Sequence, residues 1–91
     1  MKKKFPLEIV CAEGVLFQEE VESVYLFGDE GEFELLPFHY PLVASLASSK
    51  INIAGYDPVP IQSGVVMFNN NECTVIVEVP RGGAKIVKAW S

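Results

Sequence analysis

The chain of 91 residues is 49% hydrophobic, which is enough for one small domain with a modest core but not for two domains. Seven basic and twelve acidic side chains give a formal net charge of −5. All twelve acids lie between Phe5 and Pro80, where Lys50 is the single base. Such an acidic surface repels nucleic-acid phosphates and anionic lipid, so we expect a basic protein partner instead.

Short runs of alternating apolar residues, separated by turn signals, follow one another along the chain. Alternation is clear at Leu7, Ile9 and Cys11, then at Val24 and Leu26, and again at Val75, Val77 and Val79. Glycine, proline, serine or asparagine clusters mark turns at 13–14, 28–31, 48–49, 55–58 and 69–71. This spacing predicts an all-β domain over residues 1–80, a sandwich of two antiparallel sheets with almost no helix.

The pattern changes after Pro80, where Arg81, Gly82 and Gly83 form a flexible break. We treat residues 81–91 as a separate short C-terminal tail. It is either irregular, a single helical turn or an added strand, because an isolated helix needs roughly 12–15 residues. The glycines lack the Gly-Lys-Ser/Thr ending of a phosphate-binding loop, so they predict a hinge.

Membrane insertion and metal binding are not indicated by the sequence. The longest uncharged stretch, residues 35–49, is shorter than the roughly 20 residues that span a bilayer, and Glu8 interrupts any export signal. Cys11 and Cys73 lack metal-ligand spacing, and His39 is the only histidine. We therefore expect a soluble or membrane-peripheral protein with two reduced core cysteines, no metal and no cofactor.

Several ordered blocks resemble one known family. These are residues 7–17, 21–24, the Gly-Asp-Glu-Gly-Glu-Phe block at 28–33, the Leu-Pro-x-His-x-Pro-Leu block at 36–42, and the hairpin at 64–77. Together they resemble the N-terminal β-sandwich domain of F-type ATP synthase epsilon subunits over residues 7–79. The chain differs from the family at Glu34 and Phe38, where glycine is usual, and at Tyr40, where alanine is usual.

The resemblance implies a non-catalytic central-stalk subunit that couples the gamma subunit to the membrane c-ring during ATP synthesis driven by an ion gradient. It implies a monomer within a hetero-oligomer, peripheral on the cytoplasmic side of the inner (plasma) membrane, without direct membrane insertion and without nucleic acid. The family's C-terminal helical hairpin has no counterpart here, so neither its inhibitory switch nor its ATP site is carried over.

The resemblance also assigns contact residues. Glu32, with its neighbours Glu30 and Gly31, matches the loop region that meets the c-ring. The residues expected to contact gamma are Cys11, Phe38, His39, Tyr40 and Ala44. Without the resemblance, the seven acids between Glu19 and Glu34 are an ordinary solvated face.

Three other interpretations remain open from the sequence. Glu30 and Glu32 could serve a small glycosidase as a carboxylate pair, which requires a cleft and carboxyl groups roughly 5–9.5 Å apart. His39 could act as a general base or a pH sensor, which requires a positioned partner. The chain could also be a free-standing β-sandwich protein-binding domain that no longer belongs to a synthase.

Overall fold

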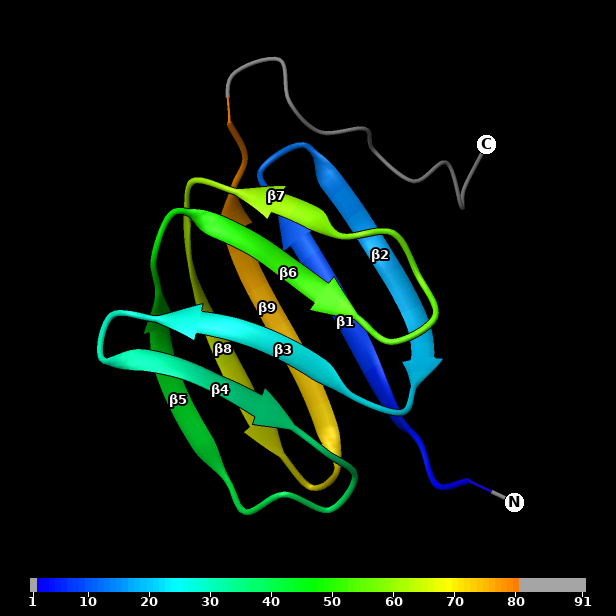
Figure 1. Cartoon of the computed structure of the whole chain (residues 1–91). Helices are drawn as coiled ribbons and strands as arrows, with labels where there is room; N and C mark the ends of the chain where they lie inside the picture. Colours follow the sequence, from blue (N-terminus) through cyan, green and yellow to red (C-terminus); the bar gives the residue numbers. More distant parts are fainter. Residues whose placement is uncertain (1, 81–91) are drawn as a thin grey trace.

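The computed structural model describes residues 2–80, which form nine strands and no helix (Figure 1). The strands are β1 (Phe5–Cys11), β2 (Gly14–Val21), β3 (Val24–Gly28), β4 (Gly31–Leu35), β5 (Leu42–Leu46), β6 (Ser49–Ile53), β7 (Val59–Ile61), β8 (Ser63–Asn69) and β9 (Glu72–Glu78). The all-β fold expected from the alternating apolar residues is confirmed. The predicted tail at 81–91 lies outside the described residues.

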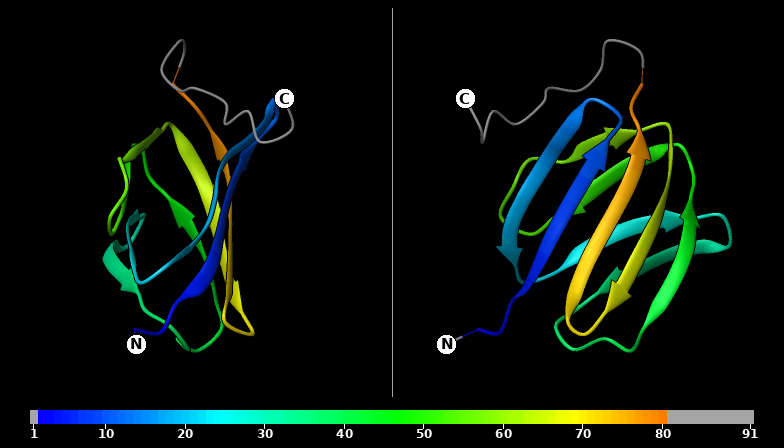
Figure 2. Two further views of the ribbon diagram at one scale, coloured as in Figure 1. Left: turned by 90° about the vertical axis from the view of Figure 1, so that its right-hand side faces the viewer. Right: turned by 180° about the vertical axis from the view of Figure 1, so that it is seen from behind.

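The strands form two layers that pack face to face (Figure 2). One layer has the order β2-β1-β9-β8-β5, and the other contains β4, β3, β6 and β7. The layers are joined at one corner, where Gly28 of β3 pairs with Leu46 of β5. Two backbone hydrogen bonds flank this pair, from Asp29 N to Ser45 O at 3.1 Å and from Ala47 N to Phe27 O at 2.9 Å.

One strand pair departs from the expected antiparallel arrangement. Strands β1 and β9 are parallel, with Leu7 opposite Cys73 and Val10 opposite Ile76. A short turn can join only antiparallel neighbours, and these two strands come from opposite ends of the described chain. Their direction is therefore set by packing in the finished sandwich, which turn signals cannot reveal.

The predicted turns lie where glycine and asparagine indicated them. Asn70 and Asn71, at the tip of the β8–β9 hairpin, have φ values of 53° and 58°. Asparagine tolerates this left-handed region better than other residues with a side chain, so the predicted hairpin tip is confirmed. Gly31, with φ of 130°, ends the β3–β4 turn and begins β4.

The core forms between the layers, mostly from every second residue of the strands. Its buried members are Phe5, Leu7, Ile9, Leu16, Phe17, Val21, Val24, Leu26, Leu35, Leu46, Ile51, Ile53, Ile61, Val66, Phe68, Cys73, Val75 and Val77. The Phe5 and Phe68 rings meet edge to face with centroids 5.2 Å apart. Cys73 is buried as expected, whereas Cys11 is only half-buried at the end of β1, and both thiols are free.

Within residues 2–80 no helix is long and apolar enough to cross a membrane.

The β8–β9 pairing makes Gly64 sensitive to any side chain. A Cβ there would lie 2.9 Å from the Ile76 carbonyl oxygen and 3.0 Å from Val77 Cγ1. Because the closer atom belongs to the backbone, Gly64→Ala must push the paired strands apart. We expect a loss of about 1–3 kcal/mol in the free energy of unfolding, measured by urea denaturation. Val65→Ala, a truncation on the outer face of the same strand, is the control, and an equal loss in both variants contradicts this account.

The buried cysteine predicts a loss of stability in alkali. Burial raises the pKa of the Cys73 thiol from 9.0 to about 12. The unfolded chain therefore releases this proton at a lower pH than the folded chain does. The stabilising contribution of the neutral thiol is complete below about pH 9 and is lost as the pH rises toward 12, by up to about 1.4 kcal/mol per pH unit.

The measurement compares wild type with Cys73→Ala, a variant that keeps every other titrating group. We expect the difference in their free energies of unfolding to shrink between about pH 9 and pH 12, as followed by urea denaturation at fixed ionic strength. A difference that stays constant across this window contradicts the assignment.

Candidate functional site

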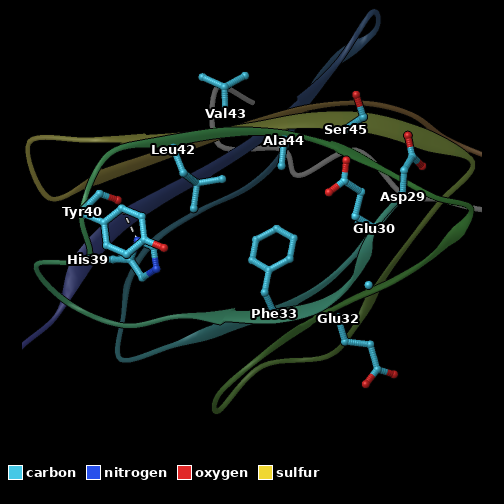
Figure 3. Close-up of a pocket in the computed structure, with 12 residues that line it drawn as sticks. Asp29, Glu30, Glu32, Phe33, His39, Tyr40, Leu42, Val43, Ala44 and Ser45 are labelled. Atoms are coloured by element: carbon cyan, nitrogen blue, oxygen red, sulfur yellow. Dashed lines mark hydrogen bonds between the residues drawn. The ribbon is translucent and has the colours of Figure 1, made fainter.

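An open cleft of about 540 Å³ lies between β4 and β5, beside the corner where the layers join (Figure 3). The cleft forms because β4 pairs with β3 on one side and has no partner strand on its other side among residues 2–80. It is lined by Gly28, Asp29, Glu30, Gly31, Glu32, Phe33, His39, Tyr40, Leu42, Val43, Ala44 and Ser45. Phe33, Leu42 and Ala44 pack against the core beneath it.

One end of the cleft is acidic. Asp29 and Glu30 occupy the β3–β4 turn, and Glu32 is the second residue of β4. Phe33 packs against the core, so the alternation of the strand turns Glu32 and Glu34 outward into solvent. The predicted acidic edge therefore has its carboxylates exposed, at a strand edge where a partner can reach them.

Glu32 is held by a neighbour from β3. The Tyr25 hydroxyl donates a hydrogen bond to Glu32 Oε2 at 2.7 Å. This bond, together with desolvation and the charges of Glu32 and Glu34, raises the pKa of the Tyr25 phenol above its ordinary value. The phenol, which is protonated at neutral pH even at its ordinary pKa, therefore keeps its proton and remains a donor to still higher pH.

The other end of the cleft is aromatic. The rings of His39 and Tyr40 stack with centroids 4.3 Å apart, and His39 also meets Phe68 edge to face at 5.8 Å. His39 Nδ1 donates to the Tyr40 carbonyl oxygen at 2.7 Å. Within residues 2–80 the imidazole thus bonds to a backbone carbonyl and not to a carboxylate. General acid–base catalysis needs a positioned partner such as a carboxylate, and this arrangement does not supply one.

The structure brings together most of the predicted contact residues. All three residues assigned to the c-ring, Glu30, Gly31 and Glu32, line the cleft, and so do His39, Tyr40 and Ala44 from the gamma set. Phe38 and Cys11 lie outside it.

Phe38 occupies a position that favours glycine. Its φ is 65°, in the left-handed region, and its N–H donates to Asn71 Oδ1 at 2.6 Å. The ring is 65% exposed, with Lys3 Nζ 5.3 Å from its centroid. Phe38 therefore occupies a backbone conformation that glycine adopts without steric cost.

Cys11 lies at the end of β1, where its Sγ donates to Glu13 Oε1 at 3.3 Å. It packs against the edge of the core. The predicted gamma residues are thus spread over more than one surface of the sandwich.

A second surface was not predicted from the sequence. Val43, Val65, Met67 and Ile76 are large apolar residues with exposed fractions of 73%, 38%, 36% and 50%. Val43 pairs with Met67 across β5 and β8, and Val65 pairs with Ile76 across β8 and β9. These four residues form one contiguous patch, which we call the apolar stripe, on the outer face of the larger layer.

A signal for the apolar stripe was present in the sequence. Residues 65–68 read Val-Val-Met-Phe without alternation, and an unbroken apolar run indicates a strand that is apolar on both faces. Contiguous apolar patches on a surface mark contact sites, whereas isolated exposed apolar residues need no explanation.

The geometry does not support the glycosidase alternative. Figure 3 shows Glu30 extending toward β5 and Glu32 extending away from it. Two carboxyl groups that act on one glycosidic bond must face each other across the substrate. The carboxylates of Glu30 and Glu32 instead point in different directions, which suits a contact surface better than a catalytic pair.

Residues 4–80 match the family of the ATP synthase delta/epsilon chain, beta-sandwich domain. The chain is 42% identical over 76 residues to the ATP synthase epsilon chain of a Sulfurovum species, a match that covers 79% of this chain and 59% of that protein. It is 49% identical over 82 residues to the epsilon chain of Campylobacter jejuni subsp. doylei, covering 86% of this chain and 64% of that protein. The chain thus spans about three fifths of the length of these relatives.

Two solved structures have the same fold. One belongs to the central stalk and c-ring of the Tetrahymena thermophila mitochondrial ATP synthase, with a TM-score of 0.71, 11% identity and coverage of 85% of this chain and 65% of that chain. The other belongs to the Euglena gracilis mitochondrial ATP synthase, with a TM-score of 0.75, 21% identity and coverage of 81% and 50%. With a family match that spans the strands from β1 to β9, this chain belongs to the ATP synthase delta/epsilon chain β-sandwich family.

Proposed function

We propose that this chain is a non-catalytic, central-stalk component of an F-type ATP synthase. Its family membership and its relatives, which are named ATP synthase epsilon chains, support this proposal. We assign the function to a sandwich domain at residues 1–80, with 81–91 as a tail. In this role the chain is a monomer within a hetero-oligomer, peripheral on the cytoplasmic side of the inner membrane, coupling gamma to the c-ring without a cofactor.

The observation that carries the proposal is that one small sandwich has two adjoining surfaces of different chemistry. The acidic turn, with Glu30, Gly31 and Glu32, supplies charge at one end of the cleft. The apolar stripe runs on the outer face of the layer that contains β5. A part that links two partners needs two such surfaces on one rigid body.

We assign the acidic turn to the c-ring. Its carboxylates are exposed, so they set orientation and association rate more than affinity. A polar, basic loop is the matching partner chemistry, and the c-ring presents its polar loops toward the stalk in the resembling family.

We assign the apolar stripe and the adjoining aromatic bend to gamma. Val43 of the stripe lies in β5, three residues after Tyr40, which is 73% exposed. This apolar area faces solvent in the free chain. Its burial against gamma favours the complex, by roughly 25 cal/mol for each Å² of apolar surface removed from water. Phe38, Tyr40 and His39 extend this contact, whereas Ala44 in the cleft and Cys11 at the end of β1 are the members of the predicted gamma set that lie apart from the stripe.

Charge reversal at the acidic turn tests the c-ring assignment. This chain, co-expressed with the gamma subunit of the same genome, is expected to co-elute with gamma in size-exclusion chromatography at micromolar concentration. Glu32→Lys is expected to leave that complex intact and to weaken its attachment to purified c-ring by about tenfold, because an opposed pair of charges becomes a like pair. Attachment is measured by biolayer interferometry at physiological salt.

Glu20→Lys is the matched control, since Glu20 is an exposed acid of β2 outside the cleft. It is expected to bind gamma and c-ring as wild type does. If gamma does not co-elute with the wild-type chain, the rotor role is wrong and a free-standing binding domain takes its place. If Glu32→Lys loses gamma instead of the c-ring, the two surfaces are assigned the wrong way round.

Charging the apolar stripe tests the gamma assignment. Ile76→Asp places a carboxylate in the stripe, where burial against gamma leaves it desolvated and unpaired. We expect gamma binding to fall at least about tenfold, because an unpaired buried group costs about 1–3 kcal/mol or more. The readout is co-elution with gamma, with a thermal melt of the free chain to establish that it is folded.

Lys50→Asp makes a larger charge change of the same sign on an exposed residue of β6, in the other layer, and is expected to retain gamma. Retention of gamma by both variants removes the stripe from the interface.

A further inference from the structure

The hydrogen bond between Tyr25 and Glu32 crosses the β3–β4 pair diagonally. In the register of these strands Tyr25 lies opposite Glu34, and Phe27 lies opposite Glu32. The hydroxyl therefore reaches past its direct partner to the next carboxylate along β4, where it meets Oε2 at 2.7 Å. Diagonal neighbours at this spacing are within reach of an aromatic side chain.

The phenol is better fixed than the carboxylate that it holds. Tyr25 belongs to a strand with partners on both sides, since it also pairs with Asn52 of β6. Its ring packs edge to face on Phe27, with centroids 5.5 Å apart at 77°. Glu32 is exposed on an edge strand, one residue after Gly31 and the turn. The bond therefore restricts the Glu32 side chain on the edge strand, because it ties that side chain to Tyr25 in the middle of the layer.

The bond uses one oxygen of the carboxylate. Oε2 of Glu32 accepts from Tyr25, whereas Oε1 has no hydrogen-bond partner within residues 2–80. A short O–H···O bond to a charged acceptor is among the stronger hydrogen bonds of proteins. It restricts the rotamer of Glu32 while leaving Oε1 able to accept from another molecule.

We propose that Tyr25 is a positioning residue, whose hydroxyl pre-orients the Glu32 carboxylate for contact with a polar donor of the c-ring. The proposal rests on the assignment of the acidic turn to the c-ring. Holding the side chain before the encounter reduces the ordering cost that a free glutamate meets on binding. The sequence match assigned Glu32 to this contact, and the tertiary structure adds the residue that holds it.

The charges around the bond agree with this role. Glu32 and Glu34 both raise the pKa of Tyr25, so the hydroxyl remains the donor to a higher pH than an isolated phenol does. Removal of the hydroxyl frees the carboxylate without changing the net charge of the turn at neutral pH. The effect of positioning can therefore be separated from the effect of charge.

Tyr25→Phe is the test, because it keeps the ring and its packing on Phe27. We expect binding of the gamma complex to purified c-ring to weaken about two- to tenfold, with thermal stability and gamma co-elution close to wild type. In a Glu32→Ala background the same change is expected to add nothing, since no carboxylate remains to be oriented. Tyr56→Phe is the matched control: its ring packs on Phe17 in another part of the sandwich, and it is expected to bind c-ring normally.

A second measurement needs no synthase. In the free chain labelled at the tyrosine Cζ with ¹³C, NMR titration follows the Tyr25 phenol directly. Its pKa is expected to fall when Glu32 is changed to alanine, because the hydrogen bond and one negative charge are removed. An unchanged pKa overturns the proposal whether or not the chain binds a c-ring.

The outcomes separate this proposal from the function that it rests on. If Tyr25→Phe binds c-ring as tightly as wild type while Glu32→Lys does not, positioning by Tyr25 is wrong and the c-ring assignment stands. If both variants bind as wild type does, the c-ring assignment fails, and the positioning role fails with it. A Tyr25→Phe defect that persists undiminished in Glu32→Ala shows that Tyr25 acts by its own contact, which also overturns the proposal.

Discussion

The arrangement of this domain depends on the corner where β3 meets β5. Gly28 fits closely there, because a Cβ would lie 3.0 Å from Phe33 Cε1 and 3.2 Å from the Gly31 carbonyl oxygen, and both neighbours would have to move by a few tenths of an ångström. Gly28 also pairs with Leu46, and this pair joins the sheet of one layer to the sheet of the other. Beyond this single pair β4 and β5 diverge, and the cleft is the space between them. The same corner fixes the acidic turn at the mouth of the cleft.

From that corner the two surfaces follow by strand alternation. Along β4, Phe33 turns to the core and Glu32 to solvent, whereas along β5 and β8 both faces are apolar. Apolar area supplies most of the free energy of association, and exposed charge supplies direction and rate. In the proposed rotor role it is useful to have both on one body with a continuous core, because a load on one surface reaches the other through packed side chains that deform little.

Much of the candidate site could be read from the sequence, although by different routes. The turn at 28–31 and the outward direction of Glu32 follow from glycine placement and period two, and the proline-flanked bend locates His39. The positive φ of Phe38 could not be read from its own residue type, since an aromatic side chain gives no signal for that conformation. The grouping of the acidic turn with Tyr40 and Ala44 in one cleft was also out of reach, because they lie on different strands whose distance is set by the corner.

The sequence by itself determined the fold class, the turn positions, the core residues of β1, β3 and β9, and the family. Each of these rests on local chemistry: backbone conformational preference at turns, and alternation along a strand. Only the tertiary structure decided the parallel β1–β9 pair, the extent of the apolar stripe and the Tyr25–Glu32 bond. These features depend on which strands become neighbours and in what register, and residues far apart in the chain settle that jointly when the two layers close over one core.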